Sequence, residues 1–271
     1  EALRCVDEVI TFDGPIALHI IERVKPDVLT CGYGYSLKDV KGRELVESWG
    51  GKVIITCTGD AKDEPSTTKT ISRLRRADVA EIVRLGSAHS VNPTSKLQLM
   101  ADEFLKVISA GIPGDVADLG TYRGGSALIL RRLAPDKHLH LFDTWAGTPY
   151  DDPMCHHKRG EWVASLEDCQ VLVGRDDRTY YRQGVFPRTV CWPEGDKFCF
   201  VYCDMDTYQA TRDAIEFFWP RLSPGGVMVF DDYRWTPCAG VEKAVDEAFT
   251  DYKTCDVRVV ESQYTCIVEK R

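Results

Sequence analysis

Residues Val116–Gly125 read VADLGTYRGG, and this stretch decides the fold that we expect. Its first four residues are typical of the end of a buried strand, and Gly120, Gly124 and Gly125 follow at once. The next residues, SALILRRL, favour a helix. A glycine turn between a strand and a helix N-terminus lets the backbone approach a ligand closely. We therefore expect a ligand-binding loop at the edge of an α/β sheet.

The composition is typical of a soluble globular protein. The 271 residues are 44% hydrophobic and 28% charged, which is enough for one large domain or two smaller ones. A net charge of −8 without any basic run argues against a nucleic-acid partner. No apolar run reaches the roughly 20 residues that span a bilayer, and no signal peptide is visible, so we expect no membrane partner. The 11 cysteines contain no C-x-x-C pair and favour free thiols in a reducing compartment, the cytoplasm.

The first 76 residues alternate expected strands and helices. Strands are predicted at 5–12, 27–30 and 52–57, and helices after Pro15, at 43–49 and after Ser66–Thr68. This order predicts a parallel α/β domain over residues 1–76. The polar segment at 77–94 ends in turn-forming residues and is expected to be a linker to a second domain at 95–271.

The first domain resembles a known family through four runs, VDEVITF, PDVLTCGYGYS, GRELVESWGGKVIITC and STTKTISRLR. They are similar to the C-terminal half of the RfaE/HldE-like sugar-phosphate nucleotidyltransferases, which implies phosphate contacts at Ser66–Thr68. The H-x-G-H nucleotide signature of that family is absent, and Cys31 stands where a lysine is usual. We therefore expect a partial nucleotidyltransferase-like domain without transferase activity, used for packing, dimerisation or tethering. An active half-site is the alternative.

In the second domain, Asp143 ends an expected strand about 20 residues beyond the glycine turn, where a carboxylate can accept hydrogen bonds from ribose hydroxyls. The polar insertion at 148–177 is too long for a plain connector and is expected to be a lid. It contains Cys155, His156 and His157. We interpret the adjacent histidines as solvated side chains rather than metal ligands.

Four further acidic residues follow two strands that are expected to be adjacent and central. Asp204 and Asp206 end one strand, and Asp231 and Asp232 end the other. The carboxyl ends of parallel strands meet at one edge of a sheet, where ligands bind. Uncompensated carboxylates there repel one another, and a hard divalent cation such as Mg²⁺ removes this repulsion. Helix N-capping by these acids is the simpler alternative.

Five runs of the second domain resemble the macrocin O-methyltransferase (TylF-type) family: ADLGTYRGGSALIL, FDTWAGTP, GVFPRTV, CDMDTYQATRDAIEFFWPRLSPGGVMVFDDY and GVEKAVDEA. The resemblance implies a Rossmann-like fold, with a mostly parallel sheet and an antiparallel last strand. It also implies Mg²⁺-dependent transfer of a methyl group from S-adenosyl-L-methionine to a hydroxyl of a sugar or glycosylated small molecule. We expect a homo-oligomer.

The resemblance assigns roles to individual residues. It implies that Asp204, Asp231 and Asp232 are metal ligands and that Asp206 is the general base. Some members place a histidine nearby, which we expect this chain to lack. The implied cofactor contacts are Asp118, Gly120, Thr121, Tyr122, Gly124, Ser126, Asp143, Thr144 and Asp204.

Two other functions fit the same residues. A catechol-type O-methyltransferase also uses Mg²⁺ and acids at these strand ends, so a phenolic acceptor stays open. A non-catalytic binding or scaffolding protein is the other alternative, and it fits the missing signature in the first domain.

Overall fold

The computed structural model describes residues 18–31, 38, 40–55, 76–188, 196–250 and 253–271. These residues fall into two units, Glu1–Pro65 and Ser66–Arg271. Among the described helices, none is long and apolar enough to cross a membrane.

The N-terminal unit contains two helix–strand pairs. They are α1 (Leu18–Val24), β1 (Val28–Cys31), α2 (Arg43–Ser48) and β2 (Lys52–Ile55). The strands β1 and β2 pair in parallel, and Val46 of α2 is fully buried. This is the parallel α/β arrangement that the sequence predicts. The strand predicted at 5–12 and the helix start predicted at Ser66–Thr68 lie outside the described residues.

The second unit is built on a sheet with the strand order β5-β4-β3-β6-β7-β9-β8. The strands are β3 (Asp115–Leu119), β4 (Leu139–Asp143), β5 (Thr179–Gln183), β6 (Phe198–Cys203), β7 (Leu222–Phe230), β8 (Cys255–Val260) and β9 (Thr265–Lys270). Strands β3 to β7 run parallel, whereas β9 is antiparallel to both of its neighbours. The predicted Rossmann-like sheet with a reversed last strand is confirmed.

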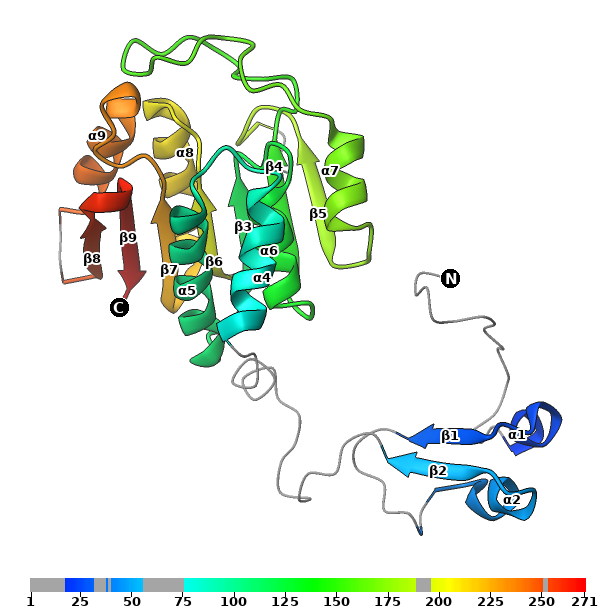
Figure 1. Cartoon of the computed structure of the whole chain (residues 1–271). Helices are drawn as coiled ribbons and strands as arrows, with labels where there is room; N and C mark the ends of the chain where they lie inside the picture. The colour runs from blue at the N-terminus through cyan, green and yellow to red at the C-terminus, as the bar shows by residue number, and fades with distance from the viewer. Residues whose placement is uncertain (1–17, 32–37, 39, 56–75, 189–195, 251–252) are drawn as a thin grey trace. The chain divides into compact units, whose positions relative to one another are not determined.

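Helices cover both faces of this sheet (Figure 1). One hydrophobic cluster lies under α4 (Arg76–Ser87), α5 (Thr94–Ser109), α6 (Gly125–Leu133) and α7 (Leu166–Val173). The other lies under α8 (Tyr208–Phe218) and α9 (Ala239–Ala248). Short 3₁₀ helices, η1 (Trp219–Arg221), η2 (Thr236–Cys238) and η3 (Glu261–Gln263), complete the described elements. Strand β6 is the middle strand of the sheet and is buried along its whole length. Its carboxyl end therefore lies near the middle of the sheet edge.

Helix α4 occupies most of the segment that the sequence predicts to be a linker, 77–94. Val79 and Val83, one turn apart, are buried, and Gly86 lies so close to α6 that a Cβ there would be 2.5 Å from Ile129 Cγ1. Glu81 and Arg84 of α4 are exposed and contribute to the polar composition of the segment. The segment is therefore part of the second unit, while the exact domain limits stay a prediction.

Candidate active site

The turn after β3 is shaped by Gly120. Its φ is +81°, and a Cβ at this position would lie 1.8 Å from the carbonyl oxygen of Asp204. Only glycine lets the ends of β3 and β6 approach this closely. The backbone N–H of Asp204 donates to the carbonyl oxygen of Leu119 at 2.9 Å and closes the contact.

Asp118 supports this turn from behind. It is fully buried, and the Ser126 hydroxyl donates to its Oδ2 at 2.9 Å, which joins β3 to the first turn of α6. The Thr121 hydroxyl donates to the Asp118 carbonyl oxygen at 3.1 Å. Burial raises the pKa of Asp118 to about 7, although the Ser126 hydrogen bond opposes the shift.

Asp143, at the end of β4, holds the same turn from the side. Its carboxylate accepts hydrogen bonds from the backbone N–H groups of Tyr122 and Trp145, each at 2.7 Å. The hydroxyl of Thr144 donates to the carbonyl oxygen of Gly147 at 2.7 Å. This turn leads into the insertion at 148–177. Each carboxylate oxygen has two acceptor positions, so Asp143 can accept further hydrogen bonds from a ligand.

A cavity of about 420 Å³ joins these strand ends. The predicted site residues that line it are Gly120, Thr121, Tyr122, Ser126, Asp143, Thr144, Asp204, Asp206 and Asp232. Asp118, Gly124 and Asp231 do not line it. Gly124 instead packs against α7, where a Cβ would lie 2.9 Å from Cys169 Sγ.

Three carboxylates converge on one side of the cavity. Asp204, Asp206 and Asp232 each present an oxygen within 4.8 Å of the other two. Removal from bulk water raises the pKa of Asp204 and of Asp206 well above the usual range, and neighbouring carboxylates add to both shifts. Asp206 and Asp232 also have left-handed backbones, with φ of 61° and 57°. Such strained positions persist where the surrounding structure enforces them, often at functional sites.

Asp231 is not part of this group, which differs from the predicted ligand set. Its Oδ1 accepts from Lys96 Nζ at 2.6 Å, and its Oδ2 accepts from the Tyr202 hydroxyl at 3.0 Å. Lys96 Nζ also lies 2.7 Å from Asp232 Oδ1. Because α5 places this ammonium between the two acids, the structure groups Asp206, rather than Asp231, with Asp204 and Asp232.

The residues Lys96 and Asn92 were missed at the sequence level. Burial opposes the charged form of Lys96, but the carboxylates of Asp231 and Asp232 outweigh burial and raise the pKa of Lys96. Asn92 Nδ2 donates to Asp204 Oδ2 at 2.8 Å. Lys96 lies in the first turn of α5 and Asn92 lies just before this helix, and no sequence motif connects either residue to the acids.

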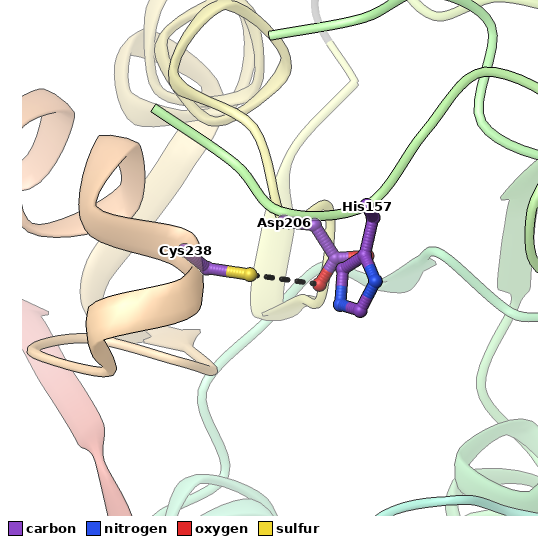
Figure 2. Close-up of side chains that lie close together, drawn as sticks. All are labelled: His157, Asp206 and Cys238. Carbon is purple, nitrogen blue, oxygen red and sulfur yellow. Dashed lines mark hydrogen bonds between the residues drawn. The ribbon is translucent and has the colours of Figure 1, made fainter. Parts of the chain in front are cut away.

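The insertion brings a histidine to the acids. In Figure 1 the insertion at 148–177 leaves β4 and arches over the carboxyl edge of the sheet. Its residues Tyr150, His157 and Trp162 line the cavity. A ring nitrogen of His157 lies within 4.8 Å of ligand atoms of Asp206 and Cys238 (Figure 2). No sequence motif pairs His157 with Asp206, because only the folded insertion brings them together.

The strand order and the reversed β9 define a Rossmann-like sheet of the methyltransferase type, with a cavity at its carboxyl edge. The solved structure of the O-methyltransferase NovP is similar, with a TM-score of 0.56 and 19% identity, over 75% of this chain and 94% of that chain. A sequence model of the macrocin-O-methyltransferase (TylF) family matches residues 28–268. The chain belongs to this family.

Two curated relatives are each similar to a part of the chain. The 8-demethyl-8-(2,3-dimethoxy-alpha-L-rhamnosyl)-tetracenomycin-C 4'-O-methyltransferase of Streptomyces olivaceus is 29% identical over 150 residues, 49% of this chain and 58% of that protein. Bifunctional protein HldE of Alcanivorax borkumensis is 43% identical over 77 residues, 28% of this chain and 16% of that protein. The chain thus spans little more than half of the first relative and a small part of the second.

Proposed function

We propose that the chain transfers the methyl group of S-adenosylmethionine to a hydroxyl of a sugar or glycosylated small molecule, with Mg²⁺ at the acidic cluster. The observation that carries the proposal is one continuous cavity, lined by the glycine turn at one side and by Asp204, Asp206 and Asp232 at the other. A donor and an acceptor can therefore lie side by side in it. The family and the rhamnosyl group in the name of the Streptomyces relative favour a sugar acceptor.

The glycine turn and Asp143 fit the cofactor. The buried Oδ1 of Asp118 has no hydrogen-bond partner among the described residues, and Gly120 leaves the start of the turn without a side chain, so its backbone can approach a ligand. We assign Asp143 to the ribose hydroxyls and the backbone at Gly120–Tyr122, with Ser126 and Thr144, to the rest of the cofactor. The bound cofactor supplies a methyl group on a sulfonium.

The acidic cluster fits Mg²⁺, which prefers carboxylate oxygens. Asp204 and Asp232 would hold the ion, which would lower the pKa of a coordinated hydroxyl. Asp231 keeps Lys96 against Asp232 and so acts as a positioning residue. Asp206, at the same cluster, would take the proton of the acceptor hydroxyl. The hydroxyl oxygen would form the bond to the methyl carbon as the bond from that carbon to the sulfonium sulfur breaks, and S-adenosylhomocysteine would be the leaving group.

Calorimetry and mass spectrometry test this function. S-adenosylmethionine is expected to bind the purified chain with and without Mg²⁺. Nucleotide sugars and glycosides, incubated with both, are then screened for the mass gain of one methyl group. Absence of cofactor binding would favour the non-catalytic alternative, and methylation of catechols alone would favour a phenolic acceptor.

The N-terminal unit is assigned a supporting role. The chain matches only 16% of HldE, and within the given residues no H-x-G-H signature accompanies the match. Packing or dimerisation is the function that these facts favour, and light scattering of the chain with and without residues 1–65 tests it. An unchanged, monomeric mass for both would contradict a role in dimerisation.

A further inference from the structure

A second group of metal-binding side chains lies beside the acidic cluster. His157, Asp206 and Cys238 each offer one ligand atom, and these atoms lie within 4.8 Å of one another. Figure 2 shows the three side chains meeting at one point, with the Cys238 thiol donating to Asp206 Oδ1 at 3.8 Å. They come from the insertion, from the loop after β6 and from η2, so three separate segments supply one donor set.

A fourth donor adjoins this group. Cys155 Sγ lies 3.8 Å from Cys238 Sγ, and the two side chains are 3% and 0% exposed. Two thiolates on a tetrahedral zinc ion, with Zn–S bonds of about 2.3 Å, stand about 3.8 Å apart. A disulfide would instead need the two sulfurs at about 2.0 Å. The observed spacing fits two ligands of one ion, and it is also the contact distance of two packed thiols.

The backbone holds these donors in place without the thiols. The N–H of His156 donates to the carbonyl oxygen of Pro237 at 2.8 Å, and the N–H of Gly240 donates to that of Met154 at 3.4 Å. The His157 ring packs against Trp162, with ring centroids 5.1 Å apart. These contacts fix the insertion against η2 and α9, so the segments that carry Cys155, His157 and Cys238 are held together by the backbone.

We propose that His157, Asp206 and Cys238, with Cys155 in the fourth position, bind a divalent transition metal such as Zn²⁺. Thiolate and imidazole ligands favour zinc over magnesium, whereas the neighbouring carboxylates favour magnesium. Each thiol that ligates the ion releases its proton to solvent. Asp206 belongs to both donor sets, so an ion in the thiol site withdraws this carboxylate from the acidic cluster. The site does not depend on the proposed methyl transfer.

Cobalt titration of the full chain, reduced and stripped of metal under anaerobic conditions, tests the site. Co²⁺ is expected to bind at one equivalent with a thiolate-to-cobalt charge-transfer band and the visible bands of a tetrahedral ion, and Zn²⁺ is expected to remove both. Cys238→Ser is expected to weaken the charge-transfer band, because Cys155 still supplies one thiolate, and the double variant Cys155→Ser/Cys238→Ser is expected to abolish it. His157→Ala is expected to weaken binding by at least about tenfold. His156→Ala is the matched control, because His156 is exposed and outside the donor set.

Three results would overturn the proposal: no binding of Co²⁺, binding without the charge-transfer band, or an unchanged titration in Cys238→Ser. If Cys238→Ser does not fold, as judged by circular dichroism, His157→Ala decides, and wild-type binding by that variant refutes the site. No S-adenosylmethionine is present in this titration, so its outcome is separate from that of the proposed function.

Discussion

Replacement of Gly120 by alanine is expected to destabilise the second unit more than the same change at Gly160. The two glycines have nearly the same φ, +81° and +85°. Alanine in this left-handed region costs about 1–2 kcal/mol at either position. The cost of backbone strain is therefore the same in the two variants. The difference between their unfolding free energies measures the effect of the close approach of Gly120 to β6.

The surroundings of the added methyl group set the difference. At Gly160 no atom lies within 4 Å of a built Cβ, whereas at Gly120 the carbonyl oxygen of Asp204 lies at 1.8 Å. The ends of β3 and β6 must part by roughly 1.5 Å to restore a normal contact. This movement breaks the 2.9 Å hydrogen bond from Asp204 N–H to the Leu119 carbonyl oxygen. A buried backbone group left without a partner costs about 1–3 kcal/mol.

Urea unfolding followed by tryptophan fluorescence measures both variants. Gly120→Ala is expected to lose about 2–5 kcal/mol of unfolding free energy, against about 1–2 kcal/mol for Gly160→Ala. Gly120→Ala is also expected to weaken S-adenosylmethionine binding in calorimetry, because the turn moves with the strand. Equal losses of stability in the two variants would refute the argument from close approach.

Three further predictions address the charged groups of the site. Burial raises the pKa of Asp118 to about 7 in the folded chain, so the folded state holds this proton more tightly than the unfolded state does. The contribution of this proton to the unfolding free energy is complete below about pH 4 and is lost as the pH rises through about 7. The total change is about 4 kcal/mol. Asp118→Asn should flatten this part of the profile of urea midpoint against pH, and an unaltered slope would contradict the assignment. Lys96→Met leaves two buried carboxylates without their counter-ion and is expected to cost about 3–5 kcal/mol at pH 7, whereas Lys106→Met, whose side chain is 66% exposed, should leave the urea midpoint nearly unchanged. Similar midpoints for the two lysine variants would show that the buried pair is not needed. Asp206→Asn is expected to bind S-adenosylmethionine as wild type and to lose turnover by at least about 100-fold, and near-normal turnover in the mass-spectrometric assay would exclude Asp206 as the base.

Local sequence determined the elements that carry the site. The glycine spacing after Val116 requires a turn with positive φ, and the structure has Gly120 and Gly124 at +81° and +91°. Acids that directly follow buried strands must emerge at the carboxyl edge of a parallel sheet, so Asp143 and Asp204 reach the cavity as predicted. The family resemblance supplied the reversed last strand. These features depend on residues that are neighbours in the chain, and a sequence pattern can therefore reveal them.

Only the tertiary structure decided which side chains meet. Lys96, on a helix far away in the chain, holds Asp231 and leaves Asp206 to join Asp204 and Asp232. The polar composition of residues 77–94 hid the buried face of α4, because that face is defined by its packing against α6. His157 reaches Asp206 and Cys238 through a folded insertion without a periodic pattern. Contacts between distant segments depend on the packing of the whole unit, so composition and spacing along the chain do not encode them locally.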